Sequence, residues 1–133
     1  MSIEELESEL GISFHDALLC TLSTDFVSRT AEMVLDLCVG DPDAPPGPER
    51  ERRRRGRLVL TGLEYLAVDP PDPTYPYRGP GPVDIDACSA DPAVASRYRI
   101  PNGAFAARLF VSDWNAFIHL AAMNATMSWL QPE

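Results

Sequence analysis

The sequence predicts an α+β fold that is mainly antiparallel β-sheet, half-barrel or sandwich-like, with a short N-terminal helix. Residues 14–26, 30–39 and 57–68 alternate apolar and polar side chains, and they come before any strong helical periodicity. Alternation with one polar side is typical of an antiparallel sheet that has one face in water. The apolar face must then be covered, so we expect the sheet to curl or to form a second layer.

A short helix is expected over residues 2–10. Ser2 is a suitable N-cap, and Glu5 follows three positions later, as in a capping box. Gly11 is suited to end the helix because glycine readily adopts the left-handed conformation.

The first two strands are expected to form a hairpin. In residues 30–39, the side chains of Met33, Leu35 and Leu37 share one face. The third strand, residues 57–68, contains Gly62 near its middle, which indicates a bulge or a bend.

Two irregular, proline-rich excursions are expected at residues 40–56 and 69–103, within a single domain that spans residues 1–133. A structureless segment as long as the second one is unusual inside a compact domain. Short edge strands can lie within it, at residues 83–87 (VDIDA) and 97–100 (RYRI).

The C-terminal part of the chain allows two interpretations. Residues 104–111 are expected to form a strand. Residues 112–130 fit either a helix, with an apolar stripe at a spacing of three to four, or a strand, with polar side chains at every second position. We favour a strand over residues 116–130, with a bulge near residues 121–122, because asparagine and threonine are poor helix formers.

The charge distribution limits the classes of partner. The formal net charge is −9, and all 11 basic residues are arginine, a bias typical of GC-rich bacterial genomes. Six arginines lie between residues 50 and 57, which we interpret as a solvated loop. The acidic remainder repels phosphate, so the sequence predicts no nucleic-acid binding and favours a basic protein partner.

Cellular location is predicted from the termini and the cysteines. The acidic N-terminus does not resemble a signal peptide, and the only long apolar stretch, near the C-terminus, is interrupted by polar residues. Three cysteines without regular spacing indicate a reducing compartment. We therefore expect a cytoplasmic protein without a membrane partner. Its oligomeric state stays open, and exposed strand edges would permit a dimer.

The candidate polar site consists of residues from both ends of the chain. His15 and Asp16 begin the first strand, whereas Asp113 and His119 lie in the last part of the chain. If these ends meet in the sheet, an imidazole and a carboxylate could carry out acid–base chemistry. The histidines match no metal-binding spacing, so no metal or cofactor is predicted.

The triplet Asp113, Trp114 and Asn115 brings a carboxylate, an indole and an amide together at the start of an element. It is our best candidate for a specific hydrogen-bond network. No nucleophile elbow, phosphate-binding loop or dinucleotide fingerprint is present, so no catalytic residue is predicted.

The FHDALL segment, followed by an alternating strand, a turn and a second strand over residues 14–39, resembles the start of several small bacterial families. These families include immunity-type proteins of polymorphic toxin systems and domains of unknown function. The resemblance implies a small acidic cytoplasmic protein that works by binding another protein.

Three hypotheses on function follow. The first is a non-enzymatic protein-binding module of the immunity type. The second is a small-molecule-binding domain, with a pocket in a curved sheet that is lined by the tryptophans, capped by residues 69–103 and anchored by His15 or His119. The third is an enzyme that uses His15 and Asp16.

Overall fold

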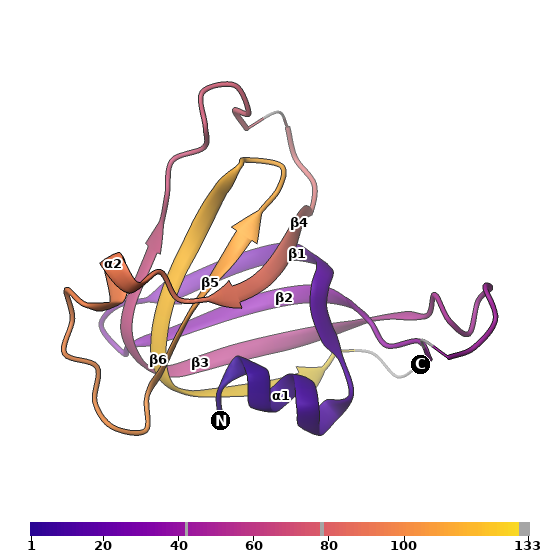
Figure 1. The fold of residues 1–133 in the computed structure, drawn as a ribbon, viewed down its shortest axis with the longest axis horizontal. Helices are drawn as coiled ribbons and strands as arrows, with labels where there is room; N and C mark the ends of the chain where they lie inside the picture. Colours follow the sequence, from indigo (N-terminus) through magenta and orange to yellow (C-terminus); the bar gives the residue numbers. More distant parts are fainter. Residues whose placement is uncertain (42, 78, 131–133) are drawn as a thin grey trace.

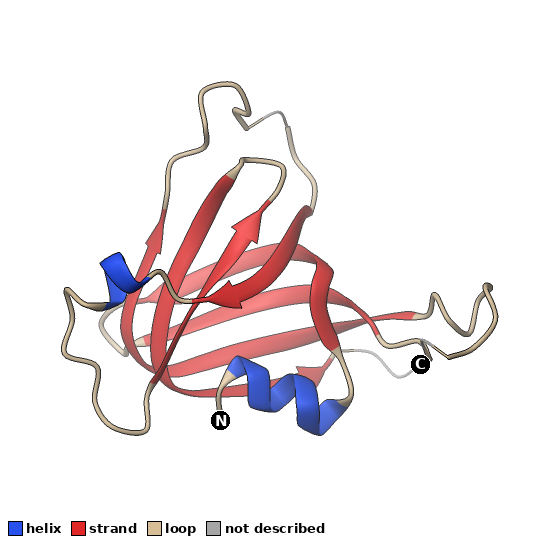
Figure 2. Ribbon diagram, viewed as in Figure 1, coloured by secondary structure: helices blue, strands red, loops and turns tan. Residues whose placement is uncertain are grey.

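Six strands form one closed antiparallel barrel in the computed structural model, which describes residues 1–41, 43–77 and 79–130 (Figures 1 and 2). Around the barrel, their order is β1-β2-β3-β6-β5-β4. The elements along the chain are α1 (Ile3–Leu10), β1 (Ser13–Asp25), β2 (Thr30–Cys38), β3 (Arg53–Val68), β4 (Val83–Ser89), α2 (Pro92–Ala95), β5 (Phe105–Val111) and β6 (Ala116–Trp129). The mainly antiparallel sheet and the short N-terminal helix are confirmed.

The expectation of a half-barrel or sandwich is corrected, because β1 pairs with β4 as well as with β2 and so closes the sheet. In the closed barrel, the apolar face of the sheet surrounds the interior, so its side chains pack against one another and away from water. Inward positions alternate with outward ones along β2, as expected, and its Met33, Leu35 and Leu37 are fully buried. The other large, fully buried side chains are Phe14, Leu58, Leu60, Ile85, Leu109, Val111, Ile118 and Leu120.

Helix α1 lies across one end of the barrel (Figure 1). The Ser2 hydroxyl accepts a hydrogen bond from the backbone N–H of Glu5 (3.1 Å), and Gly11 ends the helix with a φ of 63°. Ile3 and Leu6 are buried against the barrel interior. The predicted N-cap and the predicted end of the helix are therefore confirmed.

Two irregularities bend the long strands. In β1, the register against β2 shifts between Ser13 and Leu18, and Asp16 has a φ of 53°. In β3, Gly62 has a φ of 62°, and the register against β6 shifts between Leu63 and Tyr65. The bulge expected near residues 121–122 thus lies on the opposing strand, next to the glycine that indicated a bend.

The arginine run corrects a second expectation. Strand β3 begins at Arg53, so residues 53–57 are not part of a solvated loop. Acidic residues of β2 compensate the charge from the neighbouring strand: the Arg53 side chain bonds Asp36 (3.0 Å), and Arg57 approaches Glu32 (3.6 Å). Such pairs of opposite charge on neighbouring strands are stabilising, and they allow an arginine-rich segment to form a strand.

The long excursion at residues 69–103 contains regular structure. VDIDA forms the core of β4, as expected, whereas residues 97–100 form turns and irregular backbone instead of a strand. The four-residue helix α2 follows β4 and was not predicted. The excursion therefore supplies one wall of the barrel, and residues 69–77 and 79–82 project beyond the strands (Figure 1).

The C-terminal part is a strand, so the helical interpretation of residues 112–130 is wrong. Strand β6 pairs with β3 from Ile118 to Trp129 and with β5 over its first half. None of the helices in the described residues is both long enough and apolar enough to span a bilayer.

Candidate functional site

His15 joins two strands that are far apart in the sequence. Its Nε2 lies 3.2 Å from an Asp16 carboxylate oxygen, and its Nδ1 contacts the carboxylate of Asp86 on β4. The backbone N–H of Asp16 donates to the same Asp86 oxygen (3.0 Å). The irregular backbone of β1 places these groups on the outer surface, where the His15 side chain is 76% exposed.

The paired carboxylates determine the protonation of His15. The hydrogen bond that His15 donates to the Asp86 carboxylate is the main cause that raises the pKa of His15 above 6.5, and the negative charge of Asp16 adds to it. A protonated imidazole has no lone pair with which to accept a proton. The arrangement therefore favours the protonated form of His15, in which the imidazolium bridges carboxylates of β1 and β4.

A group of carboxylates, here called the Asp cluster, surrounds this bridge: Asp16, Asp84, Asp86 and Asp113. The backbone N–H of Asp84 donates to the Asp113 carboxylate (2.8 Å), which ties the β5–β6 turn to the start of β4. Partial burial and the charges of Asp16, Asp86 and Asp113 raise the pKa of Asp84. The cluster is thus a concentration of like charge on one face.

The predicted hydrogen-bond network around Asp113, Trp114 and Asn115 is confirmed. The Asn115 amide donates to the Asp72 carboxylate (3.2 Å), and the Trp114 carbonyl accepts from the backbone N–H of Asp72 (2.9 Å). Asn115 has a φ of 46°, a conformation that asparagine tolerates better than most residues. The triplet fastens the excursion that follows β3 to the β5–β6 turn.

A cavity of about 440 Å³ lies beside this turn. Tyr77 and Trp114 form part of its wall and meet edge to face, with ring centroids 5.1 Å apart. Asp113 also lines the cavity, together with Pro76, Pro80, Pro82 and Val83. The cavity therefore combines aromatic surface with one carboxylate of the Asp cluster.

His119 lies apart from His15. It is buried in β6, and its Nε2 lies 3.1 Å from the Asp69 carboxylate. The expected meeting of the two ends of the chain therefore occurs through Asp113, which reaches the Asp cluster, and not through His119.

The pocket of the second hypothesis is found only in part. Trp114 lines the cavity beside residues 76–83, but among the residues that the structure describes neither histidine is in its lining. Trp129 also lies elsewhere, since it packs against the core beneath the guanidinium of Arg54, which is 4.6 Å from the ring centroid.

One group in the described chain has the geometry for a metal ion. His15, Asp16 and Asp86 each offer one ligand atom, and these atoms lie within 4.8 Å of one another. The same atoms also satisfy one another as an imidazolium between two carboxylates, and that pairing would have to break before a metal could bind.

Sequence reasoning missed Asp84 and Asp86. Their alternation in VDIDA predicts that both face away from the core, which was the available signal. The pairing of β4 with β1, which brings them to His15, has no signature in the sequence.

Comparison of the chain with protein-family models, with curated proteins and with solved structures gave no match.

Proposed function

We propose that the protein is a non-enzymatic binding module of the immunity type, and that the Asp cluster with the neighbouring aromatic cavity is its contact face for a basic protein. The observation that carries the proposal is the gathering of four carboxylates from β1, β4 and the β5–β6 turn on one face. The alternative of a small-molecule site is favoured only by the cavity at Trp114.

Charge complementarity supports the basic partner. His15 is the bridging cation of the cluster, while the nearby Arg53 is engaged by Asp36 and by the backbone carbonyl of Asp16 (3.2 Å). Net negative charge therefore remains at the face. A partner that presents cations would relieve the repulsion among the carboxylates and would be steered toward the face during association.

The aromatic cavity adds a place for an anchor residue. Tyr77 and Trp114 offer ring surface, and Asp113 offers a carboxylate at the same wall. A guanidinium or ammonium side chain is attracted both to an aromatic ring and to a carboxylate. An arginine or lysine of the partner is the side chain that fits this combination.

The test uses immobilised protein to capture partners from a lysate of the source cells, and mass spectrometry to identify them. The captured protein is then purified, and its Kd is measured at 50 and 500 mM NaCl. We expect a basic protein whose affinity falls as salt rises. The immunity-type assignment further expects that the captured protein arrests growth when expressed alone, and that coexpression with this chain relieves the arrest.

Two double variants separate the contact face from the overall charge. Asp84→Asn with Asp113→Asn removes two charges from the face, and Glu5→Gln with Glu9→Gln removes two from exposed positions on α1. The first variant should weaken binding at least about tenfold, or about 1.4 kcal/mol, and the second should bind like the wild type. A neutral or acidic partner, or equal weakening by both variants, would overturn the proposal.

A further inference from the structure

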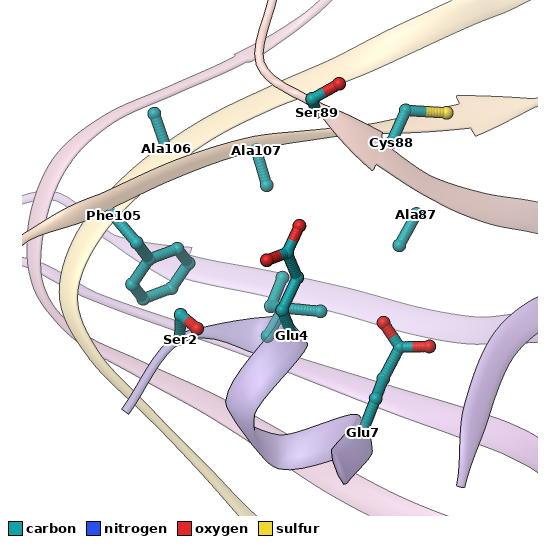
Figure 3. Close-up of a pocket in the computed structure, with 10 residues that line it drawn as sticks. Ser2, Glu4, Glu7, Ala87, Cys88, Ser89, Phe105, Ala106 and Ala107 are labelled. Carbon is teal, nitrogen blue, oxygen red and sulfur yellow. The ribbon is translucent and has the colours of Figure 1, made fainter.

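A second cavity, of about 200 Å³, opens between α1, the end of β4 and the start of β5 (Figure 3). It lies at the opposite end of β4 from Asp84, so it is separate from the proposed contact face. The lining residues are Ser2, Ile3, Glu4, Glu7, Ala87, Cys88, Ser89, Phe105, Ala106 and Ala107.

The floor of this cavity is apolar barrel interior that remains open. Ala87, Ala107 and Phe105 share the inward face with fully buried residues such as Leu109, yet all three are only partly buried. Alanine side chains leave space between the sheet and the helix that covers it. A small apolar group of a ligand could cover the exposed surface of these side chains. Each CH₂ group buried there would contribute roughly 0.8 kcal/mol to binding.

Two carboxylates form the wall opposite this floor. Figure 3 shows the side chains of Glu4 and Glu7 turned toward β4 and β5. One oxygen of Glu7 accepts the backbone N–H of Phe14 (3.2 Å), and this bond fixes the direction of its carboxylate. No basic side chain lines the cavity among the residues described there.

The electrostatics of the cavity favour a cation. The nearby N-terminus of α1 contributes about half a positive charge, whereas Glu4 and Glu7 together contribute two negative ones. The helix offers no compensation of its own, since its sequence IEELESEL contains no basic residue. A positively charged ligand is therefore preferred over an anion.

We propose that this cavity binds a short aliphatic diamine. Side chains three residues apart on a helix have Cβ atoms roughly 5–6 Å apart, which suits two ammonium groups joined by a chain of about four carbons. The carbon chain lies over Ala87, Ala107 and the ring of Phe105, and one ammonium group pairs with each carboxylate. The cavity is smaller than the roughly 300–1,000 Å³ of sites for drug-sized molecules, which limits the ligand to this size.

The experiment measures binding of 1,4-diaminobutane to the full chain by calorimetry in 150 mM NaCl, where exposed charges are largely screened beyond about 8 Å. Butylamine keeps one ammonium group, and butane-1,4-diol keeps none. We expect saturable binding of the diamine at one site, at least tenfold weaker binding of the monoamine and none of the diol. No saturable binding of the diamine would overturn the proposal, as would equal binding of diamine and diol.

Three variants locate the site. Glu4→Gln with Glu7→Gln removes both charges but retains an oxygen that can accept the N–H of Phe14, and Ala107→Leu fills the floor. Both should lower the diamine affinity at least tenfold, with the fold of each checked by circular dichroism and thermal unfolding. Glu5→Gln with Glu9→Gln is the matched control, because it removes the same charge from the same helix outside the cavity. Equal weakening in the control would show binding to overall charge and would overturn the proposal, while partner capture by the Asp cluster would stand.

Discussion

Replacing Gly62 by alanine tests the reason for which β3 bends where it does. The φ of 62° at Gly62 is unfavourable for a residue with a side chain, at roughly 1–2 kcal/mol. A Cβ added there would also lie 2.7 Å from both Cβ and Cγ of Met123 on β6. These Met123 atoms are next to the backbone, so they cannot move aside without shifting the strand. Overpacking of this kind costs about 1–3 kcal/mol.

Gly11 provides a matched control. Its φ is 63°, but a Cβ added there would meet no atom within 4 Å. Both substitutions carry the same backbone penalty and the same gain from restricting the unfolded chain. Their difference therefore isolates the clash, and we expect Gly62→Ala to destabilise the protein by about 1–3 kcal/mol more than Gly11→Ala.

Urea denaturation followed by circular dichroism measures both free energies of unfolding, with the m-value as a check that the same surface is exposed. In the background of Met123→Gly, which removes the two contacting atoms, the excess cost of Gly62→Ala should disappear. Equal destabilisation by the two alanine substitutions would refute the assignment of the close β3–β6 approach to Gly62.

Three further results are expected. By NMR, the pKa of His15 should lie above 6.5 and should fall toward 6.5 in Asp86→Asn. Because this pKa is raised in the folded state, protonated His15 should stabilise the protein below pH 6.5, and this contribution should be lost as the pH rises through the folded pKa. The pKa of Asp25, lowered mainly by the hydrogen bond from the backbone of Ser28, should lie below 3.8 by carboxyl NMR, and Asp25→Asn should remove the loss of stability that accompanies acidification through that folded pKa. Thermal or urea unfolding should show that Leu60→Ala costs about 2–5 kcal/mol, whereas Leu10→Ala, 40% exposed, costs less than about 1 kcal/mol.

Local patterns predicted most of the strands because burial on one face leaves alternation in the sequence. Strand β2 and the preferred strand over residues 116–130 are found close to their expected bounds. The start of β3 was not predicted, because Arg53 is stabilised there by Asp36 of another strand. A pattern read along one strand contains no information about the neighbour that compensates its charge.

Closure of the barrel could not be predicted for a related reason. Strand β4 lies far along the chain from β1, and their backbone pairing involves only Ala17, Leu18 and Leu19 of β1. The candidate site shares this limit: His15 and Asp16 were identified, but Asp86, which completes the bridge, comes to them only through that contact.

The pairing between β1 and β4, over three residues, is also the shortest strand pairing of the barrel, since every other pair of neighbouring strands is paired over five residues or more. His15 on β1 and Asp86 on β4 contact each other beside this pairing and connect the two strands through their side chains. Loss of the imidazole proton weakens the attraction between His15 and Asp86, at the place where the fewest paired residues close the barrel. As the pH rises through the pKa of His15, we therefore expect opening of the barrel to begin at the pairing of β1 with β4.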